Sequence, residues 1–276
     1  MPRNADELVA LLDLEKIDDD LFRGQQMPTS RPIVFGGQVA AQAMVAASRT
    51  VPAEFAVHSL HSYFLQPGDP SVPTIYDVEN LRDGRSFLTR RVIAQQHGRP
   101  IYAQTLNFHV DESGYEHQDP MPVVPPPEEC APVERGSLED EHQHEWDVVE
   151  MRTIRELEPN PAHPGRQRVW LRVSSPLPDD PFWHTAALTY LSDMTLMGAA
   201  LAPHGLSFTK GEVFLASLDH TVWFHRPMRA DEWWLYDQHS PAASNGRGLV
   251  LAGIYSRAGE LVASVAQEAV MRKVRS

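Results

Sequence analysis

The 276-residue chain has a single cysteine, Cys130, so it cannot form an intrachain disulfide bond. A lone cysteine is typical of proteins from reducing compartments. The chain also lacks an apolar run of the roughly 18 residues that a membrane-spanning helix needs. Its first residues have neither the basic nor the apolar region of a signal peptide. We therefore expect a cytoplasmic protein with no membrane span.

Positive charge is also scarce. The chain has 24 Lys and Arg residues against 37 Asp and Glu, a net charge of −13. A nucleic-acid partner is excluded on this ground, because a phosphate backbone needs a basic surface. An anionic ligand would have to bind in a local basic pocket. The hydrophobic share of 42% is enough for a substantial core, in one large domain or two of ordinary size.

One aromatic phrase occurs twice. VHSLHSYFLQP ends at Pro67, and ASLDHTVWFHRP ends at Pro227, which is 160 residues later. The dipeptide Tyr-Asp recurs at the same distance, at 76–77 and 236–237, and a turn glycine recurs 161 residues on, at 98 and 259. A nearly constant offset over about 40 residues indicates two copies of one structural unit.

Each copy predicts one helix followed by an antiparallel meander of four strands, with Gly, Pro, Asn and Asp at the turns. The first copy predicts a helix over 37–48 and strands over 57–65, 74–83, 86–96 and 101–110. The second copy predicts a helix over 181–201 and strands over 213–225, 232–242, 247–257 and 261–272. Short links between regularly spaced strands favour pairing of sequential neighbours.

These elements predict an α+β double hotdog, in which two helix-wrapped antiparallel sheets join side by side. We divide the chain into an N-terminal hotdog domain (1–110), a linker (111–166) and a C-terminal hotdog domain (167–276). The linker is polar and proline-rich, with at most one short element. Leucines near the N-terminus, at 8, 11, 12 and 14, predict a short amphipathic helix.

Three polar residues of the second copy stand on mainly apolar surfaces. Asp193 shares one face of the predicted helix with Ala186, Tyr190 and Met197. Gln267 is the one polar residue on its face of the last strand, and Ser217 lies in the first. Each feature alone is ordinary in a structural role, but a buried carboxylate needs partners. Together they predict a functional site.

The first copy has no matching polar set. Its helix lacks an acidic residue, and the position that corresponds to Gln267 falls near Leu106 or Asn107. A purely structural polar network should be more evenly shared between two copies of one framework. We therefore place the chemistry in the C-terminal half.

Other candidate motifs are discounted. The histidines and glutamate of HQHE (142–145), with His117 upstream, lack the HExxH pattern, so we expect no metal site and no cofactor. Gly36 and Gly37 lack the wider pattern of a dinucleotide loop. We expect them to form a tight entry into the first helix, with backbone near a ligand. His220 and His225 are interpreted as structural residues.

Five long segments resemble the acyl-CoA thioesterase II family, the double-hotdog acyl-CoA hydrolases. The resemblance runs from about Leu8 to Arg272. It is weak only in the linker, which is shorter and differently composed than in familiar members of the family. The segments are VFGGQVAAQAMVAA, VHSLHSYFLQPGDP, IYDVENLRDGRSFLTRRV, LDHTVWFHRP and LVASVAQEAVMR.

The resemblance implies hydrolysis of fatty acyl-CoA thioesters to free fatty acid and CoA, with acyl-CoA as the partner. Asp193, Ser217 and Gln267 match the family's water-positioning residues, with Ser217 where threonine is more familiar. The resemblance also implies a role in fatty acid and lipid metabolism and a homo-oligomer. Expected substrate contacts are Gly36, Gly37, Met194 and Met197, with Arg85 and Arg91 for the CoA phosphates.

Two other functions stay open for this fold. A hotdog hydratase or dehydratase would need a histidine about one turn after Asp193, but His204 lies too far along and follows a proline. A non-catalytic acyl-CoA-binding protein is the second alternative, if Ser217 cannot replace threonine. A covalent acyl-Ser217 intermediate is disfavoured because no adjacent histidine base is evident.

Overall fold

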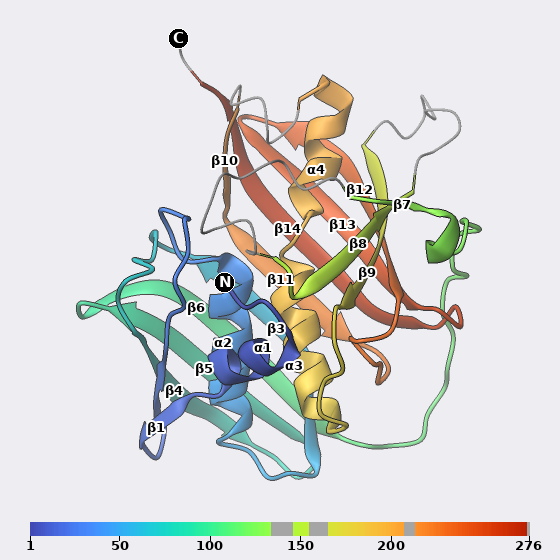
Figure 1. The fold of residues 1–276 in the computed structure, drawn as a ribbon. Helices are drawn as coiled ribbons and strands as arrows, with labels where there is room; N and C mark the ends of the chain where they lie inside the picture. Colours follow the sequence, from blue (N-terminus) through green and yellow to red (C-terminus); the bar gives the residue numbers. More distant parts are fainter. Residues whose placement is uncertain (134–145, 155–164, 207–212, 275–276) are drawn as a thin grey trace.

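One antiparallel sheet of 14 strands runs through the computed structural model, which describes residues 1–133, 146–154, 165–206 and 213–274 (Figure 1). The N-terminal half supplies β1 (Glu15–Asp18), β2 (Leu21–Gly24), β3 (Phe55–Phe64), β4 (Thr74–Asp83), β5 (Phe87–Gln96) and β6 (Arg99–Val110). The rest of the chain supplies β7 (Ala131–Pro132), β8 (Val149–Thr153), β9 (Arg166–Val173), β10 (Val213–Ser217), β11 (Asp219–Phe224), β12 (Trp234–Ser244), β13 (Arg247–Ser256) and β14 (Leu261–Lys273).

The two halves meet where β3 pairs with β11. The antiparallel register places Thr221 opposite His61 and Val222 opposite Leu60. Because the repeated phrase forms both strands, the two copies join edge to edge through equivalent elements. The same meander occurs on both sides of this junction, in the strand order β4-β5-β6-β3-β11-β14-β13-β12. The predicted architecture, two antiparallel sheets joined side by side, is confirmed.

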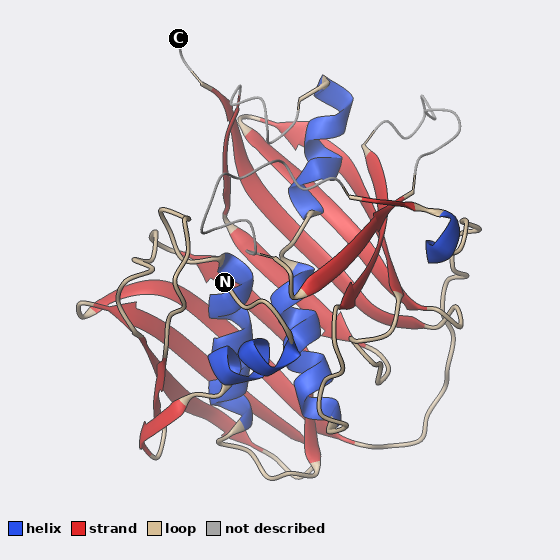
Figure 2. Cartoon of the chain, viewed as in Figure 1, coloured by secondary structure: helices blue, strands red, loops and turns tan. Residues whose placement is uncertain are grey.

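Two helices lie side by side on the same face of this sheet (Figure 2). In α2 (Gly36–Ser48) every residue from 37 to 47 is buried, and α3 (Pro181–Ser192) packs against it. Small alanine side chains let the sheet wrap closely around α2. The short helix α1 (Ala5–Leu12) contacts both, with Asn4 capping its first turn and Leu8, Leu11 and Leu12 buried.

The second long helix differs from the prediction. The expected continuous helix over 181–201 is two helices, α3 and α4 (Leu196–Leu201), followed by a 3₁₀ turn at Ala202–His204. Thr195 breaks the helix with a φ of +66°, a conformation that is costly for a residue other than glycine. The Gln238 side chain donates a 2.8 Å hydrogen bond to its hydroxyl. Contacts with distant residues therefore override local helix propensity here.

The first strand of the second meander is also interrupted. The expected strand over 213–225 is divided at Leu218 into β10 and β11. Ser217 pairs with Ala269 of β14, and Thr221 pairs with Ala266, so the register slips by one residue between them. This bulge reverses the alternation of side chains. His220 is consequently buried. In a regular strand, Trp223 would share the inward face with Ser217, but Trp223 is 38% exposed.

The segment over 111–166 contributes to the sheet as well as connecting its halves. It contains a 3₁₀ turn (Pro127–Glu129) and strands β7 and β8, which extend the edge beyond β9. Trp170 of β9 donates its indole N–H to the carbonyl of Pro125 at 2.9 Å. Strand β8 and the residues around Cys130 thus pack on the C-terminal half, whereas Trp146 contacts Phe35 of the N-terminal half. The division into domains at 110 and 166 stays a prediction.

Gly37 allows α2 and α3 to approach closely, which gives a test of this packing. A Cβ at residue 37 would lie 2.2 Å from the backbone oxygen of Tyr190, which cannot move without shifting α3. We predict that Gly37→Ala lowers the free energy of unfolding by about 1–3 kcal/mol, the usual cost of overpacking. Urea denaturation measures the change. Gly114→Ala is the matched control because a Cβ there meets no atom within 4 Å, and an equal effect of the two variants would contradict the prediction.

Candidate active site

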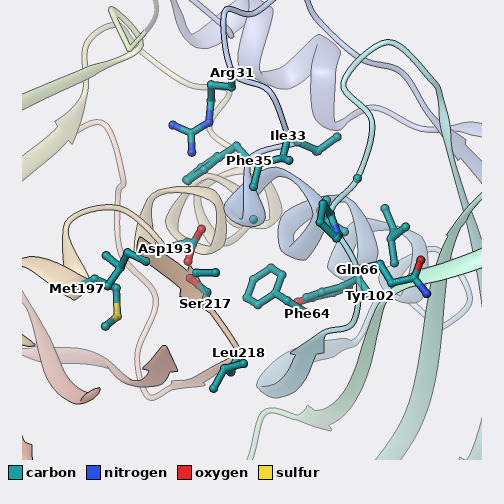
Figure 3. A pocket seen from close by; sticks show the side chains of 18 of the residues that line it. Arg31, Ile33, Phe35, Phe64, Gln66, Tyr102, Asp193, Met197, Ser217 and Leu218 are labelled. Atoms are coloured by element: carbon teal, nitrogen blue, oxygen red, sulfur yellow. The ribbon is translucent and has the colours of Figure 1, made fainter. Parts of the chain in front are cut away.

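A cavity of about 570 Å³ opens between the two halves of the chain. Its walls come from the loop before α2, the end of β3, the break between α3 and α4, and strand β10 (Figure 3). Most of the lining is apolar, so a polar group in it is poorly hydrated. The polar or charged side chains of the lining are those of Arg31, Gln66, Tyr102, Asp193, Thr195 and Ser217.

Asp193 lies at the first position after α3, where the helix has ended and the carboxylate faces the cavity. Gln267 Nε2 donates to its Oδ1 at 2.9 Å, and the backbone N–H of Gly37 donates to the same carboxylate. Burial raises the pKa of Asp193 to about 6; the bonds from Gln267 and Gly37 and the charge of Arg31 hold it below the value that burial alone would give. The carboxyl group is therefore mostly ionised at neutral pH and can still accept a proton.

Gln267 connects Asp193 to Ser217. Its Nε2 donates to Ser217 Oγ at 2.5 Å as well as to Asp193. The antiparallel pairing of β10 with β14 sets this contact, because Ser217 lies opposite Ala269, two residues from Gln267 on the same face. The structure therefore brings together the three residues that the sequence singled out, from the end of α3, from β10 and from β14. A carboxylate, a hydroxyl and an amide now converge at one point of the cavity wall.

The two glycines that begin α2 have separate positions. Gly36 lines the cavity, where an added Cβ would lie 2.7 Å from Asp193 Oδ2 and 2.8 Å from the Phe64 ring. Gly37 is buried behind it and reaches Asp193 through its backbone N–H. The absence of both side chains lets the first turn of α2 approach the carboxylate. At this end of a helix the backbone N–H groups lack helical acceptors and favour negative charge.

The remaining predicted contacts divide into two groups. Met194 and Met197 line the cavity beside Asp193. Arg85 is exposed in the turn between β4 and β5, and Arg91 is exposed on β5, 3.8 Å from Glu79. Neither arginine lines this cavity. A contact of these arginines with CoA phosphates stays a prediction.

Arg31 lines the cavity and escaped the sequence analysis. Its guanidinium carbon lies 5.7 Å from the ring centre of Phe35 and 5.6 Å from that of Trp146. Its Nε is buried without a hydrogen-bond partner, and no carboxylate of the described residues forms an ion pair with it. Nothing in the sequence around a lone arginine before Pro32 marks it, because its aromatic neighbour Trp146 comes from the distant linker.

Metal-binding and membrane-spanning features can be assessed only over part of the chain. The HQHE segment at 142–145 lies outside the described residues. Among the residues that are described, no three His, Cys, Asp or Glu side chains are grouped as a metal would require. No described helix combines the length and the apolar character that a bilayer crossing needs.

Sequence profiles of known families match both halves of the chain. The acyl-CoA thioesterase profile covers residues 137–270, and the acyl-CoA thioesterase N-terminal domain profile covers 24–109. Acyl-coenzyme A thioesterase 8 of Mus musculus is 39% identical over 96% of this chain and 88% of its own length. Acyl-CoA thioesterase 2 of Haemophilus influenzae is 39% identical over 96% of both.

Solved structures give the same result. The acyl-CoA thioesterase II TesB2 of Mycobacterium marinum superposes with a TM-score of 0.86 at 42% identity, over 97% of this chain and 98% of that one. A tesB protein of Mycobacterium avium subspecies paratuberculosis superposes with a TM-score of 0.84 at 34% identity, over 98% and 100%. The fold is thus that of the double-hotdog thioesterase II proteins. The chain belongs to the acyl-CoA thioesterase II family, as its sequence motifs predicted, and it is an acyl-CoA thioesterase.

The raised pKa of Asp193 predicts how stability depends on pH. A carboxyl group with a higher pKa in the folded than in the unfolded protein destabilises the fold once it ionises. This cost appears as the pH rises from about 4, near the unfolded value, to about 6. Relative to Asp193→Asn, which cannot titrate, the wild type should lose about 2–3 kcal/mol of unfolding free energy between pH 4 and pH 7.

Urea denaturation of both proteins across this pH range measures the difference. A constant offset between the two proteins reflects the changed hydrogen bonds of the amide and does not affect the test. Parallel pH profiles would show that the Asp193 carboxyl group has an ordinary pKa in the folded protein.

Proposed function

We propose that this thioesterase hydrolyses fatty acyl-CoA to free fatty acid and CoA, with Asp193 as the general base. The observation that carries the proposal is the contact of Asp193 and Ser217 with one amide, Gln267 Nε2, at the wall of a mainly apolar cavity. A water bound beside these three groups is the nucleophile. A base whose pKa lies near 6 is ionised at neutral pH yet close enough to it to return the proton later.

The proposed reaction has two proton transfers. The oxygen of the water attacks the thioester carbonyl carbon while Asp193 takes a proton from the water. This step gives a tetrahedral oxyanion. The intermediate collapses by breaking the carbon–sulfur bond, and the protonated Asp193 returns its proton to the leaving sulfur. The products are the carboxylic acid, which ionises in solution, and the free thiol of CoA. Holding the water beside the base removes much of the entropic cost of the attack.

The start of α2 supplies the proposed stabilisation of the oxyanion. The Gly37 N–H already donates to Asp193, and the next two N–H groups donate to Phe35, so we assign the backbone N–H of Gly36, which lines the cavity, as the donor. Arg31 adds a positive charge to the same cavity. We assign the acyl chain to the apolar part of the wall formed by Met194, Met197, Leu215 and Trp146.

Location and assembly follow from the sequence and the resemblance alone. We keep the prediction of a cytoplasmic homo-oligomer acting in fatty acid metabolism.

Release of free thiol from acyl-CoAs of graded chain length tests the proposal. The wild type should be active, and Asp193→Asn should lower kcat at least about 100-fold, the usual range for loss of a general base. Wild-type kcat/KM should fall as the pH drops through about 6, because protonated Asp193 cannot accept a proton. Circular dichroism and thermal unfolding verify that the variant is folded. A folded Asp193→Asn enzyme with wild-type activity would refute the assignment of the base.

Ser217 gives a second prediction with a built-in control. Its hydroxyl accepts a hydrogen bond from Gln267 and lines the cavity. Ser217→Ala leaves one N–H of that amide unpaired and should lower kcat about 10-fold or more. Ser217→Thr keeps the hydroxyl and restricts its rotamer, so its kcat should equal or exceed that of the wild type. Equal rates for Ser217→Ala and the wild type would contradict a role of the hydroxyl.

A further inference from the structure

His220 is a fully buried histidine in contact with Gln267, one of the proposed catalytic residues. Its Nδ1 lies 3.1 Å from Gln267 Oε1, and its Nε2 lies 2.8 Å from Ser192 Oγ. Ser192 is the last residue of α3 and directly precedes Asp193. The imidazole therefore connects the amide of Gln267 to the end of the helix that carries Asp193. His220 is not among the residues that line the cavity.

The bulge at Leu218 is what brings His220 to this position. Because the register slips by one residue between Ser217 and Thr221, both Ser217 and His220 turn toward Gln267. In a regular strand, residues three apart would face opposite sides of the sheet. The side chains of Ser217 and His220, from β10 and β11, thus meet at the Gln267 amide of β14.

The chemistry of the partners determines which ring nitrogen carries the proton. Gln267 Oε1 can only accept a hydrogen bond, so His220 Nδ1 must donate. Burial lowers the pKa of His220 to about 4, and the ring is neutral at pH 7. A neutral imidazole has one N–H, so with Nδ1 protonated Nε2 can only accept, and the Ser192 hydroxyl, which also lies 2.9 Å from the carbonyl oxygen of Thr189, donates to it. The ring is held as the Nδ1–H tautomer.

The first copy of the fold shows that the framework does not need this network. A bulge occurs at the equivalent place in β3, between Val57 and Ser59. The positions that match His220 and Gln267 are Leu60 and Leu106, which pair directly and are both fully buried. Two leucines fill the same space without the cost of burying polar groups. Packing alone therefore does not explain why the second copy has His220 and Gln267 at these positions.

We infer that His220 is a positioning residue that fixes the orientation of the Gln267 amide for the proposed reaction. With Nδ1–H donating to Oε1, both N–H groups of Nε2 point to Asp193 and Ser217. A flipped amide would set Oε1 against the carboxylate and leave Nε2 facing the imidazole. This inference rests on the proposed function, in which Asp193 is the base.

Loss of this orientation should affect the ionisation of Asp193. A carbonyl oxygen in place of the donor disfavours the ionised carboxylate and raises its pKa. The other groups that act on Asp193 are the N–H of Gly37, the charge of Arg31, and the buried phenols of Tyr102 and Tyr236. None of them is changed by a substitution at residue 220. A shift of the acidic limb of the kcat/KM profile to higher pH therefore reports a changed orientation of the Gln267 amide.

Two isosteric variants separate a positioning role from a structural one. His220→Asn places an N–H donor where Nδ1 was, and His220→Gln places one only where Nε2 was. We expect His220→Asn to keep kcat within roughly 3-fold of the wild type, with the acidic limb unmoved. His220→Gln should lower kcat at least about 10-fold and raise the acidic limb by about one pH unit, the effect of one lost hydrogen bond to the carboxylate. KM should stay unchanged in both variants.

The outcomes distinguish this inference from the function on which it rests. A wild type that releases no thiol from any acyl-CoA refutes the proposed function. An active wild type with equal kcat and equal pH profiles in the two folded variants refutes the positioning role.

A readout without turnover completes the test. ¹⁵N NMR of the wild type should show His220 as the Nδ1–H tautomer from pH 5 to pH 8. The Nε2–H tautomer, or protonation within this range, would overturn the inference even if both variants failed to fold.

Discussion

The site depends on one hydrogen-bonded contact, between the Gln267 amide and the Asp193 carboxylate at 2.9 Å. A carboxylate at the wall of a mainly apolar cavity is disfavoured, because burial favours its protonated form and raises its pKa. The amide, the Gly37 N–H and the charge of Arg31 compensate only in part, which leaves the pKa of Asp193 near 6. Because these groups offset the effect of burial only in part, the pKa of Asp193 lies close enough to neutral pH for the carboxyl group to accept and return a proton.

Duplication explains how one fold accommodates this unfavourable arrangement. Both copies contain the same helix, the same meander and the same bulge, at Val57–Ser59 and at Ser217–Thr221. In the first copy leucines 60 and 106 fill the positions of His220 and Gln267 and serve as core. The second copy carries the polar network, and the cavity opens between it and the start of α2. The N-terminal half therefore supplies Gly36 and Gly37 to the proposed site, whose side chains Asp193, Ser217 and Gln267 belong to the C-terminal half.

The breaks in regular structure are as important as the regular elements. Helix α3 ends at Ser192, which frees Asp193 to turn toward the cavity, and Thr195 is held with a positive φ by Gln238. The strand over 213–224 is interrupted at Leu218, and only this interruption sets Ser217 and His220 toward one amide. Each break is stabilised by residues far away in the chain.

The sequence by itself determined the repeat, the strands of the two meanders within a few residues, the family and the three polar residues Asp193, Ser217 and Gln267; it did not mark the edge strands β1, β2, β7, β8 and β9. Periodicity and a constant offset are local or pairwise patterns, and they survive without knowledge of the packing. Tertiary structure alone decided the division of the helix over 181–201, the bulge, the burial of His220 against Gln267, and the place of Arg31 between Phe35 and Trp146. These features arise from contacts between segments distant in sequence, so the residues themselves carry no local pattern that marks them.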